Sequence, residues 1–170
     1  MPSNIEIKAR VQNLGKTRAR AEKLSDTPVQ VIPQEDTFFH APQGRLKLRF
    51  LSRNEGQLIY YTRPDQEGPK RSDYHISHTS DPENLKRVLA LAYGIRGVVR
   101  KTRYLYLVGQ TRVHLDDVEG LGHFLELEVV MQGGQSEAEG QAIAENLMAD
   151  LGVESRDLLE GAYMDLLESH

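Results

Sequence analysis

NIEIKARV, residues 4–11, alternates polar and apolar side chains and therefore predicts a β-strand. Successive side chains of an extended strand point to opposite faces. The polar face of this strand carries Asn4, Glu6, Lys8 and Arg10. These charged side chains either meet solvent or line a site, and the rest of the chain decides between the two interpretations.

Seven further stretches show the same alternation and predict a fold rich in strands. They cover residues 36–40, 45–51, 57–63, 72–77, 98–108, 111–118 and 123–131. Gly109 and Gln110 separate two of these stretches, and this spacing predicts a hairpin with a two-residue turn.

Two helices are expected in the first hundred residues. One follows Asn13, which is a good N-cap residue. The other begins after Asp81, has Pro82 at its first position and ends before Gly94. Proline at the start of a helix and glycine just beyond its end are the preferred arrangement.

Two more helices are expected in the last third of the chain. SEAE, which begins at Ser136, forms a capping box with Glu139 and predicts a helix that ends near Gly152. The spacing of leucines after Ser155 predicts a final helix. The whole pattern indicates one α+β domain over residues 1–170, with helices packed outside an antiparallel sheet.

Composition excludes several classes of protein. The chain has 170 residues and no cysteine, so disulfides, thiolate metal sites and a cysteine nucleophile are excluded. No apolar run approaches the roughly 20 residues of a membrane span. The net charge of −4 argues against a protein that simply coats nucleic acid. We therefore expect a cytoplasmic protein with no nucleic-acid or membrane partner.

Two short motifs do not support a site. Gly15-Lys16-Thr17 resembles the end of a phosphate-binding P-loop, but the motif requires glycine where Arg10 stands. His75 and His78 are three residues apart in an expected strand, so their side chains point to opposite faces and are not expected to share a metal ion.

The polar faces of the strands concentrate charge. RLKLR, residues 45–49, places three cations in a row, and these repel one another unless an anion lies between them. Glu126 and Glu128 share one face further along the chain. A solvated sheet face is the simplest interpretation of any single strand. Clustered cations near paired carboxylates also suit a polyphosphate bound with a divalent metal ion.

A family resemblance supports the second interpretation. The stretch LDDVEGLGHFLELE, residues 115–128, resembles the CYTH superfamily, and so do the Glu-x-Lys at the N-terminus, LKLR at 46–49 and KTR at 101–103. This superfamily contains class IV adenylate cyclases, thiamine triphosphatases and inorganic triphosphatases. The resemblance implies a closed or nearly closed antiparallel β-barrel of about eight strands, the triphosphate tunnel, with the polar faces inside and helices packed outside.

The resemblance also implies residue roles. Metal binding, to Mg²⁺ or Mn²⁺, falls on Glu6, Asp116, Glu126 and Glu128. Catalysis is assigned to Glu6, Lys8, Glu126 and Glu128. Phosphate binding is implied for Lys8, Lys47, Arg49, Lys101 and Arg103. The polar faces of the strands add Arg10, Arg45, Arg63 and Arg112 to the phosphate-binding set. Arg71 and Asp73 match a further family segment more loosely.

Two positions depart from the family pattern. Asn4 stands where the first signature acid is expected, and a neutral oxygen would weaken a metal site or remove one metal. Tyr61 stands where a lysine is usual, and Arg63 on the same face could replace that lysine.

The function implied is a metal-dependent enzyme acting on a small triphosphate, namely ATP, tripolyphosphate or thiamine triphosphate. Attack by water would make it a triphosphatase, and attack by the ribose 3′-hydroxyl of ATP would make it an adenylate cyclase. A non-catalytic polyphosphate or nucleotide-binding module is the alternative, and a homodimer is left open. An RNA-binding barrel would need several stacking aromatics on the basic face, where Tyr61 is the clear candidate.

Overall fold

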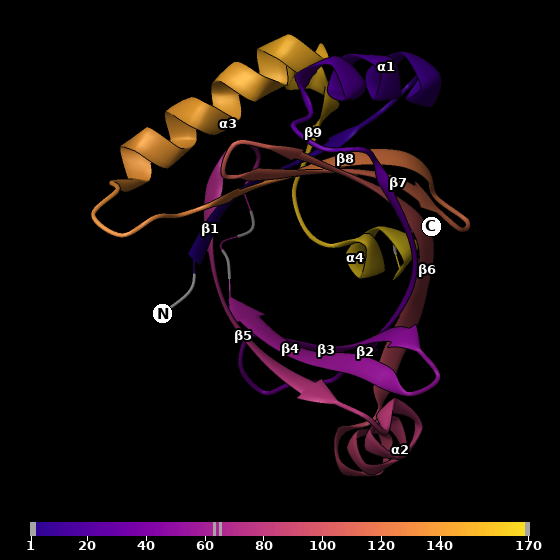
Figure 1. Ribbon diagram of the computed structural model, residues 1–170. Coiled ribbons are helices and arrows are strands. Elements are labelled where there is room, and N and C mark those ends of the chain that lie inside the picture. The colour runs from indigo at the N-terminus through magenta and orange to yellow at the C-terminus, as the bar shows by residue number, and fades with distance from the viewer. Residues whose placement is uncertain (1–2, 63, 65, 169–170) are drawn as a thin grey trace.

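The protein folds into a closed antiparallel β-barrel, described here by a computed structural model that covers residues 3–62, 64 and 66–168. Its eight long strands are β1 (Ser3–Arg10), β2 (Gln30–Phe39), β3 (Arg45–Ser52), β4 (Glu55–Thr62), β5 (Lys70–Thr79), β6 (Ile95–Val108), β7 (Thr111–Val118) and β8 (Gly122–Val130). They pair in the order β5-β4-β3-β2-β6-β7-β8-β1, and β1 also pairs with β5 and closes the ring. Figure 1 looks along this ring. The predicted α+β barrel is confirmed.

All eight predicted strands are present, although several are longer than expected. β2 begins at Gln30, six residues before the predicted strand, and β6 begins at Ile95. The early part of β2 includes Pro33 and pairs with Thr102 and its neighbours on β6. Pairing with a long neighbouring strand thus extends β2 through residues whose own preference for a strand is weak. The hairpin turn at Gly109 and Gln110 is confirmed, because Val108 pairs with Thr111 across it.

The apolar core lies outside the barrel wall, between the strands and two helices. The helices are α1 (Leu14–Leu24) and α3 (Glu137–Leu151), which cover β1, β7 and β8 in Figure 1. Ile5 and Ile7 from β1 are fully buried there together with Leu147 and Leu151 from α3. Because the aliphatic face of β1 points outward to the helices, its charged face points into the barrel.

The helix ends follow the predicted caps. The Asn13 side chain accepts a hydrogen bond from the Lys16 backbone N–H, and both bonds of the capping box between Ser136 and Glu139 are formed. Asp81 caps α2 (Pro82–Tyr93), which packs against β2, β3 and β4 at the bottom of Figure 1. Across the described part of the chain, no helix has both the length and the apolar character needed to cross a membrane.

The prediction of one long final helix was wrong. Residues Ser155–Asp157 form a short 3₁₀ turn, and Leu158–Leu159 form strand β9, which pairs with Lys8 and Ala9 of β1. Gly161 then adopts a positive φ of 81°, which favours glycine and interrupts any helix. The helix α4 spans only Tyr163–Glu168.

α4 lies across one end of the barrel and therefore appears inside the ring of strands in Figure 1. Tyr163 and Met164 pack in a second apolar cluster with Phe38, Val99 and Phe124 from the barrel wall. Gly97 permits this approach, because a Cβ atom at position 97 would collide with the Met164 side chain. The last part of the chain therefore closes the barrel on one side and places Tyr163 next to the lumen.

Candidate functional site

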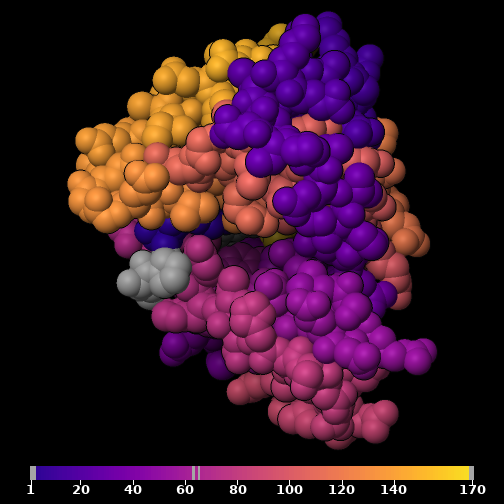
Figure 2. Space-filling model, viewed as in Figure 1, coloured from indigo at the N-terminus to yellow at the C-terminus, as the bar shows by residue number. Residues whose placement is uncertain are grey.

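The polar faces of the strands meet in one cavity inside the barrel. Its volume is about 370 Å³, and it is lined by side chains from all eight long strands and from Ala162 and Tyr163 at the start of α4. Figure 2, viewed as Figure 1, shows a hollow near the middle of the molecule. The sequence-predicted residues that line it are Glu6, Lys8, Lys47, Arg49, Lys101, Arg103, Arg112, Glu126 and Glu128. The charged face of β1 is thus part of a cavity and not a solvated sheet face.

Asp36 contacts three of the cations. This carboxylate is 1% exposed and accepts two hydrogen bonds of 2.8 Å from Arg49, from Nε to Oδ1 and from Nη2 to Oδ2. Lys101 Nζ lies 3.4 Å and Lys47 Nζ lies 3.9 Å from Asp36 Oδ2. Burial alone would raise the pKa of Asp36, but Arg49 and then Lys101 hold it well below its usual range. Three cations around one carboxylate leave a local excess of positive charge.

The same crowding lowers the pKa of Lys47 to about 7, because burial and the neighbouring Arg49 outweigh the attraction of Asp36. The Lys47 side chain remains 17% exposed and lies 5.0 Å from the centre of the Tyr61 ring, so it faces the lumen. Tyr61 itself lines the cavity at the position where the family resemblance expects a lysine.

Asp116 organises Arg103. The guanidinium donates from Nε to Asp116 Oδ1 at 2.8 Å and from Nη2 to Asp116 Oδ2 at 2.7 Å, and the Tyr163 hydroxyl donates to the same Oδ2 at 2.8 Å. Asp116 is fully buried and does not line the cavity. Burial would raise its pKa, but Arg103 lowers it. The carboxylate predicted as a metal ligand is therefore used to orient Arg103 in this structure.

Lys8 and Arg103 both reach Glu126. Lys8 Nζ lies 3.0 Å from Glu126 Oε1, and Arg103 Nη2 donates to Glu126 Oε2 at 2.9 Å. Lys8 also donates to the Gly161 carbonyl at 3.1 Å and lies 4.1 Å from the centre of the Tyr163 ring. These contacts place Lys8 between the carboxylates of β8 and the segment that closes the barrel.

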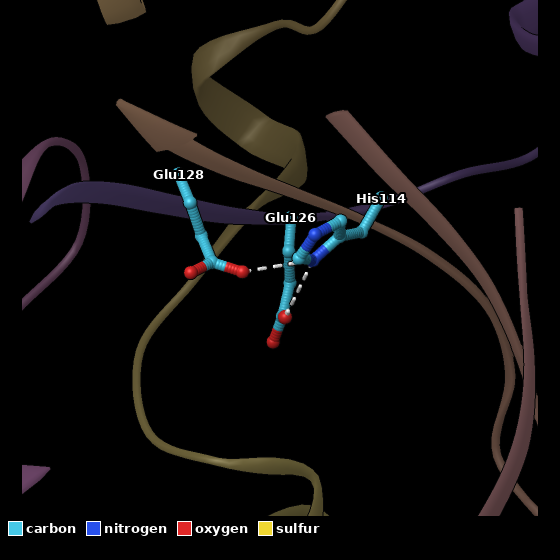
Figure 3. A group of neighbouring side chains, drawn as sticks. All are labelled: His114, Glu126 and Glu128. Carbon is cyan, nitrogen blue, oxygen red and sulfur yellow. Dashed lines mark ion pairs between the residues drawn. The ribbon is translucent and has the colours of Figure 1, made fainter. Parts of the chain in front are cut away.

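The carboxylates of the cavity lie on the neighbouring strands β1 and β8. In the register of β1 and β8, Glu6 lies opposite Glu128 and Lys8 lies opposite Glu126. The acids and Lys8 therefore line the same face. His114 of β7 points to the two glutamates of β8 (Figure 3). The pKa of Glu128 is lowered to about 2, because the charge of His114 and its contact with the carboxylate more than offset the effect of burial.

The donor set of this corner suits a divalent cation. Ligand atoms of His114, Glu126 and Glu128 lie within 4.8 Å of one another. The Asn4 Nδ2 group donates to Glu128 Oε2 at 3.0 Å, and the Asn4 side-chain oxygen is buried with no hydrogen-bond partner. Carboxylate and amide oxygens are hard ligands of the kind that Mg²⁺ and Mn²⁺ accept. The residues present therefore fit the predicted metal.

Three predicted residues do not line the cavity, and a fourth lies outside the described residues. Arg10 is exposed at the end of β1, 5.3 Å from the centre of the Phe124 ring, and does not line the cavity. Arg45 pairs at 2.9 Å with Asp165 of α4. Both lie at strand ends, beyond the central rows that face the lumen. Asp116 is withdrawn behind Arg103, and Arg63 lies outside the described residues.

The residues of the weaker motifs on β5 do not line the site. Arg71 is exposed and pairs with Asp73 at 3.0 Å, and neither residue lines the cavity. His75 and His78 are both exposed, and neither lines the cavity.

Three site residues were not predicted. Asp36 lies two residues before Phe38 on β2, so both side chains point to the same face, and both line the cavity. His114 stands between Arg112 and Asp116 in the alternation of β7, which was a usable signal. Tyr163 had no such signal, because its segment was expected to be a regular helix.

The chain resembles known proteins over nearly its whole length. The family model described as CYTH domain matches residues 3–163. A protein of Methanocaldococcus jannaschii named "Putative adenylate cyclase" is 23% identical, over 95% of this chain and 97% of its own length. The PH1012 protein of Pyrococcus horikoshii superposes with a TM-score of 0.84 at 25% identity, covering 96% of this chain and 98% of its own.

A more distant structural relative extends the likeness of fold. A presumed adenylyl cyclase from Hippeastrum, described as having a dominant triphosphatase activity, superposes with a TM-score of 0.67. It is 16% identical to this chain, and the match covers 98% of this chain and 95% of the relative.

Proposed function

Because the chain belongs to the CYTH family, we propose that it is a metal-dependent enzyme that acts on a triphosphate held inside the barrel. The observation that carries the proposal is the charge of the cavity. Among its described lining residues, the cations Lys8, Lys47, Arg49, Lys101, Arg103 and Arg112 outnumber the carboxylates Glu6, Asp36, Glu126 and Glu128. A small anion with many charged oxygens would relieve the repulsion among these cations.

Two buried carboxylates fix the orientation of two arginines. Asp36 accepts from two donors of Arg49, and Asp116 accepts from two donors of Arg103. A guanidinium has five donors, so each arginine can bind a phosphate oxygen while its carboxylate fixes its orientation. Groups fixed before the substrate arrives need little rearrangement as charge develops in the transition state.

Glu126 and Glu128 are the residues that would hold Mg²⁺ or Mn²⁺, with Glu6 beside them on β1. When bound, the cation would neutralise phosphate oxygens and polarise the phosphorus–oxygen bond. Lys8 Nζ lies 3.0 Å from Glu126 Oε1, next to these carboxylates. It is therefore placed to bind an oxygen of the same phosphate group.

Two reactions use these groups in the same way. Attack by water on the terminal phosphorus gives orthophosphate, whereas attack by the ribose 3′-hydroxyl on the α-phosphorus of ATP gives cyclic AMP and pyrophosphate. Phe38, Ile59 and Tyr61 also line the cavity and offer apolar surface to an organic group. ATP therefore belongs in the first panel of substrates beside inorganic tripolyphosphate.

The test is to incubate the protein with ATP, and separately with tripolyphosphate, in the presence of Mg²⁺ or Mn²⁺. Cyclic AMP, pyrophosphate and orthophosphate are then resolved. We expect metal-dependent product from at least one substrate. Cyclic AMP without orthophosphate identifies a cyclase, and cleavage of tripolyphosphate identifies a triphosphatase.

Two neighbouring residues of β6 supply a matched pair of variants. Lys101→Met removes a lumen cation and should lower kcat/KM by about tenfold or more, as expected for a charge-assisted contact. Arg100→Gln removes an exposed cation that pairs with Glu35 on the outer face, and should leave the rate unchanged. Binding of triphosphate without product under either metal would support the non-catalytic module instead.

A further inference from the structure

His114 is a buried imidazole whose hydrogen-bonding capacity the described residues do not satisfy. Its side chain is 1% exposed, and neither ring nitrogen has a hydrogen-bond partner among the described residues. Nδ1 approaches Glu128 Oε1 to 3.0 Å, but without the alignment that a hydrogen bond requires. A buried polar atom without a partner is unfavourable, so such an atom in a cavity points to a ligand.

The spacing of the surrounding atoms matches a metal site. Nδ1 lies 3.0 Å from Glu128 Oε1 and 3.8 Å from Glu126 Oε2 (Figure 3). Adjacent ligand atoms on one octahedral cation, with bonds of about 2.1 Å, are about 3 Å apart. The nitrogen and the two carboxylates therefore need little movement to bind the same ion.

Asn4 leaves this site one carboxylate short. It contributes a neutral amide where the family resemblance expects an acid, and its own oxygen is buried without a partner. With one carboxylate fewer, the site attracts a hard cation such as Mg²⁺ less strongly. Imidazole nitrogen is a good ligand for first-row transition metals and a poorer one for Mg²⁺. His114 would therefore raise the affinity for the transition metals.

We propose that His114 is a ligand to the divalent cation and that it makes the site select Mn²⁺ over Mg²⁺. This inference rests on the proposed function only for the presence of a metal at this corner. His114 would take the place of the missing acid, with Glu126 and Glu128 as the other ligands and the Asn4 oxygen beside them. An ordinary ion pair between His114 and Glu128 is the competing explanation for the 3.0 Å contact.

The experiment measures metal binding to the full chain without substrate. The EPR signal of free Mn²⁺ gives the Mn²⁺ affinity, and competition gives that of Mg²⁺. We expect Mn²⁺ to bind at least about tenfold more tightly than Mg²⁺, and His114→Gln to remove that preference because the variant has no imidazole nitrogen. His123→Gln is the control, because His123 is 40% exposed and does not line the cavity.

A second measurement needs no variant. Electron spin-echo envelope modulation of the Mn²⁺-loaded protein detects a coordinated imidazole nitrogen, and selective ¹⁵N-histidine labelling identifies it. Nitrogen coupling is expected in the wild-type protein and in His123→Gln. Its absence, or an unchanged Mn²⁺ preference in His114→Gln, would overturn the proposal and assign His114 to the ion pair.

The two proposals fail separately. Turnover of a triphosphate without nitrogen coupling would reject the role of His114 and keep the proposed function. Nitrogen coupling without turnover of any triphosphate would keep the metal ligand and reject the enzyme.

Discussion

At the scale of single residues, the site depends on how many cations share one carboxylate. Asp36 contacts Arg49, Lys47 and Lys101, and the crowding brings the pKa of Lys47 down to about 7. Lysine normally titrates near 10.5. Between pH 7 and 10.5 the unfolded chain therefore holds a proton that the folded protein has lost, and this residue makes stability rise with pH over that window.

Triphosphate binding should show the opposite trend with pH. The anion favours charged Lys47, so at pH 8 binding should take up a fraction of one proton, and affinity should fall as pH rises above 7. Isothermal titration calorimetry in buffers of different ionisation enthalpy measures this uptake. Lys47→Arg keeps its charge at all these pH values and should lose the uptake. Equal uptake in both proteins would assign the proton to another group.

The residues that line the site could be predicted where the alternation within a strand alone decides which face a side chain occupies. Lys8, Lys47, Arg103, Glu126 and Glu128 all line the cavity as their strands predicted. What alternation does not contain is pairing between strands. Asp116 and Asp36 both bind arginines on neighbouring strands, and only the register decides which acid remains for a metal. The same limit explains why His114 was missed as a partner of the glutamates.

At the scale of elements, the final segment differs most from its prediction. The leucines after Ser155 have helical spacing. However, Leu158 and Leu159 pair with the backbone of β1, and the positive φ of Gly161 then changes the direction of the chain. Hydrogen bonding to an edge of the barrel outweighed the weak preference for a short helix. The other three helices had explicit caps and were predicted closely.

The Tyr163 hydroxyl should contribute to holding this segment in place. Tyr163→Phe removes the 2.8 Å hydrogen bond to buried Asp116 and should lower the free energy of unfolding by about 1–2 kcal/mol. Urea denaturation measures the change. Tyr93→Phe on α2 is the control, because Tyr93 is 50% exposed, and it should have no comparable effect. Equal stability of the two variants would show that apolar packing alone retains α4.

At the scale of the whole molecule, the barrel is inverted relative to an ordinary core. Its apolar faces point outward to α1 and α3, and charged side chains fill the lumen. The repulsion among lumen cations is a cost to the folded state that a bound anion removes. Binding to the folded state alone also stabilises it by mass action.

Tripolyphosphate should therefore raise the thermal midpoint. At 100 times its dissociation constant, it should add about 2.7 kcal/mol to the free energy of unfolding. Differential scanning calorimetry measures the shift. Lys101→Met should reduce the shift at a fixed concentration, while Arg100→Gln on the outer face should not. A similar shift from sulfate at equal ionic strength would indicate general anion binding.

The pairing of β1 also affects how the molecule can form. This strand is made first during synthesis, yet its partners are β5, β8 and β9, and the last of these begins at Leu158. Contacts between residues so distant in sequence slow folding, because a long loop must close before they form. β1 can therefore pair with β8 and β9 only after those strands have been synthesised, although β5 is available earlier. Until then its aliphatic face has no α3 to cover it, and the nascent chain is most exposed to aggregation.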